Sequence, residues 1–418
     1  MTLLADLLST VFERRYRSAS TLEMGGRPLT ELADELISTA GEDTGQLLAR
    51  EILSRFDTLD DTGKRAFFTH LTTALDIDTA RVLETLEIYK SDKSKSAYRA
   101  FAKAAEPRRQ ELIRRLNQVP GATGKLVRMR ADLIRLAAED SALKALDLDF
   151  RHLFASWFNR GFLVLRPISW ESPAHILEKI IAYEAVHAID SWADLRRRLE
   201  PRDRRCFAFF HPAMPDEPLI FVEVALTKGI PGSVQTLLAE NREVIAADDA
   251  DTAVFYSISN CQSGLASISF GNSLIKQVVA DLSLELPRLA TFVTLSPIPG
   301  LIDWLESQQI AFDPNDPDTM RGLAAYYLLS AKRSDGMPVD PVARFHLGNG
   351  ALVHLVHAAA DTSEKGQQQS AGAMVNYLYD LKKVSSNHER FASRHEVAAS
   401  SDVRALASAV EKALAKGA

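Results

Sequence analysis

The chain has 418 residues, of which 46% are hydrophobic and 25% charged, a composition that is ordinary for a globular protein of about two or three domains. Its net charge of −6 gives no general case for a nucleic-acid or anionic-membrane partner. The two cysteines, Cys206 and Cys261, predict neither a disulfide framework nor a cysteine metal site, which favours a reducing, cytoplasmic compartment. We expect no secretory signal, because the amino terminus lacks a basic segment, and no membrane span, because no apolar run reaches about 18 residues.

Residues 1–155 are predicted to be helical throughout. Apolar side chains recur there at helical spacing, as in residues 47–56 and 67–75, and alternation of β-branched residues is almost absent. Residues 60–63 and 119–122 have the composition of turns between helices. The pattern indicates a helical bundle whose apolar faces pack on each other or on another subunit.

Three further features are weak candidates for chemistry. Residues 121–125 resemble a phosphate loop, but Leu126 stands where such a loop carries Ser or Thr, so we reject that interpretation. The basic cluster of residues 90–115 is predicted to be a solvated helix face, with a phosphate or partner-subunit site as the alternative. Glu184 and His187 lack a second histidine at metal-binding spacing, so we interpret them as a side-chain pair on a helix and predict no metal site.

From about residue 160 the chain changes to strands. The predicted elements are a strand at 162–168, a hairpin of 206–211 and 219–226 around a turn at 212–218, a strand at 252–259, a small-residue loop at 260–272, and a helix that begins near Leu274. A loop of small residues that enters a helix presents free backbone N–H groups at the positive end of the helix dipole. This loop is therefore a candidate site for a pyrophosphate.

Ser296 follows the next predicted strand, residues 289–295. Pro297 and Pro299 cannot donate to a ladder, so the sheet must end or splay there. The sequence thus predicts a hydroxyl at the mouth of a sheet, on a stiff turn without strand pairing, where ligand sites are common. The alternative is a proline-rich strand exit with a solvated serine.

The carboxyl-terminal part supplies a second candidate group. His346 lies next to a glycine-rich turn at residues 348–350, and imidazole is the side chain that exchanges protons near neutrality. A purely structural histidine is the alternative. Residues 370–379 add an amide and two phenols, and residues 401–416 are predicted to form an amphipathic helix.

Five blocks occur in a specific order, and together they resemble the malonyl-CoA decarboxylase family over residues 160–390. The blocks are Phe255–Ser259, the loop Gly264–Gly271 with Leu274–Lys276, Leu295–Gly300, Phe345–Ala351 and Met374–Tyr379. The resemblance implies an α+β protein, with an all-α oligomerisation domain at residues 1–155. A catalytic domain of the GNAT acetyltransferase type, with a mixed and largely antiparallel sheet, would occupy residues 156–418.

The resemblance also implies roles for individual residues. Ser296 and His346 match the catalytic serine and histidine, whereas Asn376, Tyr379 and Pro297 match the substrate pocket. The predicted CoA-binding residues are Gln262, Gly264, Leu265, Ser267, Ser269, Gly271 and Asn272. Two departures matter: Ser269 stands where animal members carry glutamate, and residues 355–357 differ from the run found in many members.

The implied activity is decarboxylation of malonyl-CoA to acetyl-CoA and CO2, a carboxy-lyase reaction. No further cofactor is expected, because the thioester carbonyl is itself the electron sink. Ser296 and His346 would then stabilise and protonate an enolate. The alternatives are an acyl-CoA N-acyltransferase of the same fold and a non-catalytic CoA-binding regulator. We expect a homo-oligomer with no nucleic-acid or membrane partner.

Overall fold

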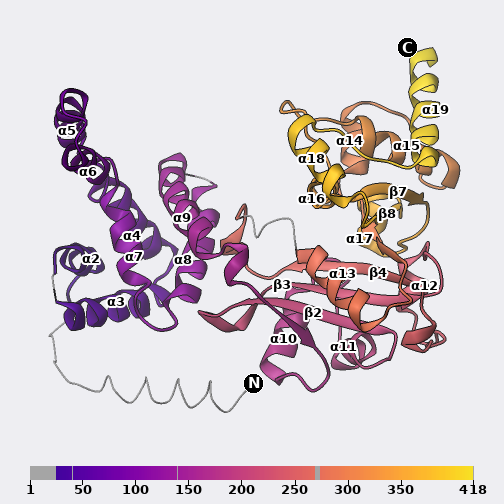
Figure 1. The fold of residues 1–418 in the computed structure, drawn as a ribbon, viewed down its shortest axis with the longest axis horizontal. Helices are drawn as coiled ribbons and strands as arrows, with labels where there is room; N and C mark the ends of the chain where they lie inside the picture. The colour runs from indigo at the N-terminus through magenta and orange to yellow at the C-terminus, as the bar shows by residue number, and fades with distance from the viewer. Residues whose placement is uncertain (1–24, 40, 139, 269–273, 418) are drawn as a thin grey trace. The chain divides into compact units, whose positions relative to one another are not determined.

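The computed structural model describes residues 25–39, 41–138, 140–268 and 274–417. The chain divides into two compact units, Met1–Asp149 and Phe150–Ala418. The first unit is helical and the second combines helices with one sheet (Figure 1). The predicted α+β class is confirmed.

The helical unit is built from helices joined by short turns. They are α2 (Leu29–Ser38), α3 (Glu42–Asp57), α4 (Asp61–Thr73), α5 (Thr79–Ser91), α6 (Lys95–Ala104), α7 (Arg108–Leu116) and α8 (Ala122–Ala137), followed by the short turn η1 (Ser141–Leu143) and α9 (Lys144–Trp157), which continues into the second unit. The apolar stripes of α3 and α4 meet at Phe56, whose ring lies 5.6 Å from that of Phe67 and 5.4 Å from that of Phe68. The helical prediction is confirmed for the described residues of this unit.

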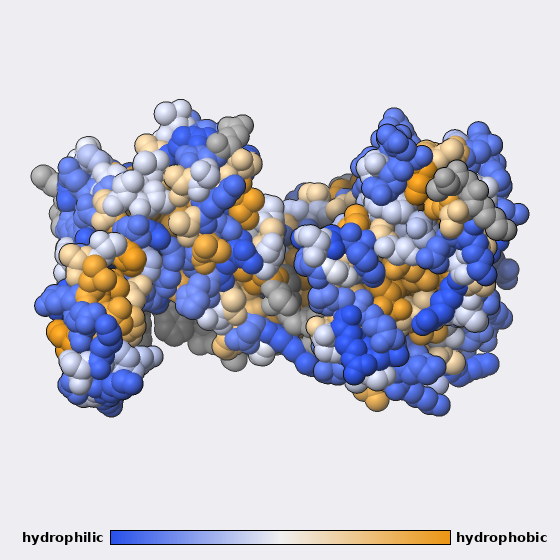
Figure 2. Space-filling model, turned by 90° about the horizontal axis from the view of Figure 1, so that it is seen from above, coloured by the Kyte–Doolittle hydropathy of each residue, from blue (hydrophilic) through white to orange (hydrophobic). Residues whose placement is uncertain are grey.

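The surface of this unit departs from a simple solvated bundle in two ways. Leu83 and Tyr98, on α5 and α6, are 63% and 57% exposed, and hydrophobic side chains reach the surface of the unit in Figure 2. The basic cluster of residues 90–115 is only partly a solvated face, because Arg109 is buried. Its guanidinium pairs with Asp149 at 2.5 Å and with Asp76 at 2.8 Å, so this member of the cluster serves the packing of helices.

The second unit contains one mixed sheet. Its strands are β1 (Val164–Ile168), β2 (Arg204–His211), β3 (Met214–Thr227), β4 (Thr252–Asn260), β5 (Thr291–Thr294), β6 (Ser296–Pro297), β7 (Leu352–His357) and β8 (Met374–Leu378). The order is β1-β2-β3-β4-β5-β8-β6, and β7 also pairs with β8. Only β4 and β5 are parallel to each other, and the other pairs are antiparallel.

The parallel pair follows from the helix between its strands. Parallel neighbours need a crossover connection, and α13 (Leu274–Glu285) supplies it, with Ile275, Val278 and Leu282 buried. In Figure 1, α13 lies on one face of the sheet, whereas α10 (Ala174–Tyr183) and α11 (Trp192–Leu199) lie on the other. The predicted strand, loop, helix, strand order is therefore confirmed.

The remaining helices surround β7 and β8 or connect strands. They are α12 (Val234–Leu238), α14 (Leu301–Ser307), α15 (Pro317–Ser330), α16 (Pro341–Gly348), α17 (Glu364–Ser370), α18 (Val384–Arg394) and α19 (Ser401–Gly417), with short 3-10 turns η2 (Arg160–Phe162), η3 (Ala247–Asp249) and η4 (Ser263–Leu265). The predicted last helix is α19, which packs on α15. No helix among the described residues is long and apolar enough to cross a membrane.

Two local predictions are wrong. The hairpin turn is shorter than residues 212–218, because β3 already begins at Met214; a bulge in the pairing of β2 with β3 accommodates its prolines. Glu184 and His187 do not pair on a helix, because α10 ends at Tyr183. The Glu184 carboxylate instead accepts hydrogen bonds from the Ser257 hydroxyl, at 2.7 and 2.8 Å, and from the backbone of the turn that follows α10.

Candidate active site

Ser296 lies where the chain leaves β4 and continues to pair only with β8, which it already contacts at Val293. The pairing of β4 with β5 ends near Phe255 and Thr294, after which Ser296 pairs with Val375 of β8. The predicted splay is confirmed, because Pro297 has no N–H group with which to continue along β4. The prediction of a turn without pairing is wrong, because an edge strand tolerates a proline, and so is the solvated alternative, because Ser296 is 5% exposed.

His346 is held by a helix that the sequence prediction missed. Asp340 caps α16, since its Oδ1 accepts a hydrogen bond from the Ala343 N–H at 2.7 Å. Pro341 occupies the first turn, where a missing N–H costs nothing, and the helix ends at Gly348. The His346 ring is 2% exposed, so the helix buries the imidazole and does not leave it on a solvated turn.

A directed chain of hydrogen bonds links four side chains. The Ser296 hydroxyl donates to Thr294 Oγ1 at 2.8 Å. The same oxygen lies 3.2 Å from Nε2 of His346, and Nδ1 of His346 lies 2.8 Å from the Tyr379 hydroxyl. With the single proton of Ser296 placed on the bond to Thr294, we assign the imidazole proton to Nε2, which then donates to Ser296. Nδ1 is then the acceptor for the phenolic proton of Tyr379.

The surroundings keep this chain uncharged. Burial lowers the pKa of His346 to about 3, so the imidazole is neutral at neutral pH. The Tyr377 ring stacks on the imidazole, with centroids 4.5 Å apart and an interplanar angle of 22°. Burial raises the pKa of Tyr379 well above its usual range, so its phenol remains a proton donor.

Thr294 joins the chain of hydrogen bonds to strand β8. Its hydroxyl oxygen also accepts the Tyr377 N–H at 3.0 Å, and its carbonyl accepts the Asn376 side-chain amide at 2.6 Å. The Asn376 carbonyl oxygen lies 2.5 Å from Nε2 of His357. Sequence reasoning missed Thr294, although its place two residues before Ser296 on a strand puts both side chains on one face.

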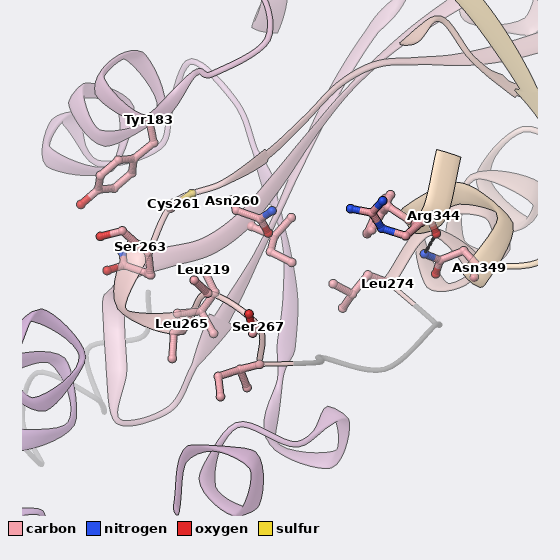
Figure 3. A pocket seen from close by; sticks show the side chains of 16 residues that line it. Tyr183, Leu219, Asn260, Cys261, Ser263, Leu265, Ser267, Leu274, Arg344 and Asn349 are labelled. Carbon is pink, nitrogen blue, oxygen red and sulfur yellow. Dashed lines mark hydrogen bonds between the residues drawn. The ribbon is translucent and has the colours of Figure 1, made fainter. Parts of the chain in front are cut away.

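Two neighbouring cavities lie beside this group. A cavity of about 260 Å³ is lined by Ser296, Pro297 and His346, together with β4 residues that include Phe255. A groove of about 600 Å³ runs past the loop after β4 and is closed on its other side by α16 (Figure 3). Asn260 and Phe345 line both spaces, so the groove adjoins the cavity of the Ser–His pair.

The predicted binding residues have different positions relative to these spaces. Gln262, Leu265 and Ser267 line the groove, and Gly264 is buried in η4 beside them. Asn376 and Tyr379 lie behind the Ser–His pair and do not belong to the described lining of either space. The remaining predictions, Ser269, Gly271 and Asn272, lie outside the described residues.

The sheet and the groove define the class of the second unit. Antiparallel strands, one parallel pair joined by a helix, and a small cavity between β4 and Ser296–Pro297, where that pair diverges, give it the arrangement of a GNAT-type domain. The chain belongs to the malonyl-CoA decarboxylase family: residues 161–317 and 314–416 match the model of the malonyl-CoA decarboxylase C-terminal domain. Residues 75–158 match the model of the N-terminal domain of the same family.

Named relatives and solved structures agree with this membership. Mitochondrial malonyl-CoA decarboxylase of Anser anser anser is 35% identical over 72% of this chain and 70% of its own length. The corresponding protein of Rattus norvegicus is 33% identical over 72% of each chain. The crystal structure of malonyl-CoA decarboxylase from Rhodopseudomonas palustris is 49% identical, with a TM-score of 0.86 over 90% of this chain and 98% of that one. The structure from Agrobacterium vitis is 48% identical, also at a TM-score of 0.86, over 91% and 100% of the two chains.

Proposed function

We propose that this chain decarboxylates malonyl-CoA to acetyl-CoA and CO2. The observation that carries the proposal is the position of the large groove beside the small cavity of Ser296 and His346, with Asn260 and Phe345 in both walls. A groove of about 600 Å³ suits the extended CoA arm, and a cavity of about 260 Å³ suits a short acyl group. Membership of the malonyl-CoA decarboxylase family supports the same substrate and the same reaction.

The substrate would lie with its CoA portion along the loop after β4. Gln262, Gly264, Leu265 and Ser267 would hold that portion, and the start of α13 would favour the negative charge of its phosphates. The malonyl thioester would enter the cavity beside Ser296 and Pro297. Ser269, Gly271 and Asn272 remain predicted contributors to the same loop site.

The chemical step breaks the bond between the α-carbon and the carboxylate. The bond electrons pass into the thioester, so that CO2 leaves and an enolate forms, with its charge on the thioester oxygen. A proton must then be added to the α-carbon. The Ser296 hydroxyl would turn from Thr294 to the substrate and give up its proton, His346 would replace it from Nε2–H, and Tyr379 would protonate Nδ1. The cycle consumes one proton from solvent. That proton must reach Nε2 of His346, which lines the cavity, so that Nδ1 returns its proton to Tyr379 and the starting tautomer is restored.

The tautomer of His346 argues against a covalent acyl-serine. A nucleophilic serine needs an imidazole nitrogen with a free lone pair to accept its proton. In the assigned tautomer Nε2 carries a proton and donates it to Ser296, so it has no free lone pair for the serine proton. The pair is therefore suited to deliver a proton and to bind charge, as a decarboxylase requires, and Asn376 would position Thr294 behind it.

The decisive experiment is product analysis after incubation of the full chain with malonyl-CoA. Acetyl-CoA and CO2 in equal amounts support the proposal, and both should fall sharply in Ser296→Ala. An acyltransferase would release free CoA only when an amine acceptor is added. A CoA-binding regulator would give no product, and either of these outcomes would overturn the proposal.

The assembly and the compartment remain predictions. We expect a homo-oligomer formed through the helical unit, because α5 and α6 leave large apolar side chains exposed. We expect a cytoplasmic location because the described cysteines are free, although the vertebrate relatives are named as mitochondrial proteins.

A further inference from the structure

The charge of the groove is concentrated on one side chain. Among the described residues that line it, Arg344 is the only charged one, and the others are apolar or neutral. Figure 3 shows Arg344 and Asn349 on the side of the groove opposite Ser263, Leu265 and Ser267. A ligand that bears several phosphate charges therefore meets its cation on α16 and not on the loop.

The guanidinium of Arg344 is already oriented. Its Nη1 donates to the carbonyl oxygens of Pro338 and Val339, at 2.7 and 2.6 Å. Within the part of the chain that the structure describes, its Nε and Nη2 atoms have no hydrogen-bond partner, and Arg344 forms no ion pair within 4 Å. Asp340 is the acid that acts on it electrostatically, from the start of the same helix. A planar guanidinium that is fixed at one nitrogen and free at two others is suited to bind phosphate oxygens.

A second polar atom faces the same space. The Asn349 side-chain amide donates to the Phe345 carbonyl at 2.8 Å. Its Oδ1 is buried, with no hydrogen-bond partner among the described residues, and Asn349 is only 4% exposed. Buried acceptors are normally satisfied, so an unpaired one in a groove wall indicates a ligand that brings an N–H group. The pantetheine arm of CoA carries two amide N–H groups.

We propose that α16 is the second wall of the CoA site, where Arg344 binds a phosphate group of CoA and Asn349 Oδ1 accepts an amide N–H of the pantetheine arm. This inference rests on the function proposed above and adds residues that the loop interpretation did not include. Arg344 and His346 lie two residues apart on one short helix. Binding of the phosphates would therefore hold the element that carries the imidazole.

The test for Arg344 compares malonyl-CoA with malonyl-pantetheine, which has the same thioester and arm but no phosphate. We expect Arg344→Gln to reduce the preference in kcat/KM for malonyl-CoA over malonyl-pantetheine by about tenfold to a hundredfold, the range for a lost charge-assisted hydrogen bond. Arg333→Gln is the matched control, since Arg333 is exposed, faces Asp335 at 3.5 Å and does not line the groove. An unchanged preference in Arg344→Gln would overturn the assignment.

The test for Asn349 uses two variants and the same pair of substrates. Asn349→Leu should raise KM for both thioesters by about tenfold without changing the preference between them. Asn349→Asp keeps the acceptor oxygen and should recover most of that loss. Equal losses in the two variants, with matching falls in melting temperature, would show that Asn349 acts only through its bond to Phe345.

Failure of this inference can be told apart from failure of the proposed function. If the wild-type chain does not convert malonyl-CoA, the function is wrong, and calorimetric titration with CoA itself still tests the wall. Arg344→Gln should then bind CoA at least tenfold more weakly, with a smaller dependence on salt than the wild type. Equal affinity for CoA in the wild type and in Arg344→Gln would show that Arg344 does not bind a phosphate of CoA.

Discussion

Tyr379 and His346 meet through a hydrogen bond of 2.8 Å between the phenolic oxygen and Nδ1. The phenol lies at the end of β8 and the imidazole lies on α16, and both are buried. In the tautomer assigned above, Nε2 donates to Ser296 and Tyr379 supplies the proton of this bond. In that assignment the Tyr379 hydroxyl favours the tautomer that can give a proton to Ser296, which makes it a direct target for mutation.

Loss of either member of the Ser–His pair should abolish most of the activity. We expect Ser296→Ala and His346→Ala each to lower kcat by about 10²–10⁴-fold, the usual contribution of a positioned proton-transfer group. The double variant should be hardly worse than either single one, because the groups act as a unit. The measurement is initial-rate kinetics of acetyl-CoA formation. Ser307→Ala, which removes an exposed hydroxyl on α14, is the control and should match the wild type.

Removal of the Tyr379 hydroxyl should lower kcat and leave KM nearly unchanged. Tyr379→Phe keeps the ring and removes the donor to Nδ1, so we expect a loss of about tenfold to a hundredfold in kcat. Tyr326→Phe is the matched control, because that half-buried ring packs against Trp304 in another part of the unit. Equal kcat values in Tyr379→Phe and the wild type would show that the tautomer does not limit the reaction.

The imidazole of His346 should stay neutral through the physiological range. Its pKa is lowered to about 3 by burial, so the folded protein does not protonate it between pH 5.5 and about 8. In the unfolded chain this histidine binds a proton at about pH 6.5, whereas in the folded chain it stays neutral. The free energy of unfolding therefore falls as the pH drops from about 6.5 towards 3. Nitrogen-15 NMR of labelled histidine, with His346→Gln for assignment, should show a protonated Nε2 and a bare Nδ1. An imidazolium signal at pH 7 would contradict this.

Asp340 should make the stability of the protein depend on pH in the opposite direction. Burial raises its pKa to about 6, and its Oδ2 has no hydrogen-bond partner among the described residues. The charged groups and phenols around it are Arg344, Tyr327 and Tyr377. A carboxyl whose folded pKa lies above the unfolded one loses stability as pH rises from about 4 to about 6. Asp340→Asn keeps the cap oxygen and should gain up to about 3 kcal/mol on the wild type over that range.

Melting temperatures at pH 4.5 and pH 7.5 test the Asp340 prediction. The advantage of Asp340→Asn over the wild type should widen with pH. Asp316 caps α15 but is only partly buried, and a hydrogen bond from Thr319 lowers its pKa. Asp316→Asn should therefore melt at a lower temperature than the wild type at pH 7.5, and this difference should disappear as the pH falls. If the difference in melting temperature between Asp340→Asn and the wild type were the same at both pH values, Asp340 would not titrate in this range.

The exposed apolar side chains of α5 and α6 should carry the subunit contact. Light scattering at micromolar concentration should give a mass that is a multiple of 46.2 kDa. The double substitution Leu83→Glu and Tyr98→Glu should lower that mass, because buried charges oppose association. Leu284→Glu, at an 81% exposed position on α13, is the control and should leave the mass unchanged. A monomeric wild type would refute the prediction.

Local sequence patterns predicted much of the fold. Helical spacing of apolar residues identified the first unit, and the order of strand, small-residue loop, helix and strand identified the core of the second. These predictions succeeded because side-chain periodicity and turn chemistry act over a few residues. The order of the motif blocks pointed to the malonyl-CoA decarboxylase family, which the comparisons confirm.

The site itself depended on the tertiary structure. Local sequence placed His346 beside a glycine-rich turn. Asp340 and Pro341 start α16, but eight residues are too few for local signals alone to hold a helix, so packing completes it. Sequence alone could rank Ser296 and His346 as candidates, but not the role of Thr294, the tautomer set by Tyr379 or the place of Arg344 in the groove. Each of these depends on contacts between segments tens of residues apart. Strand register, helix packing and burial determine such contacts, and they exist only once the whole unit has folded.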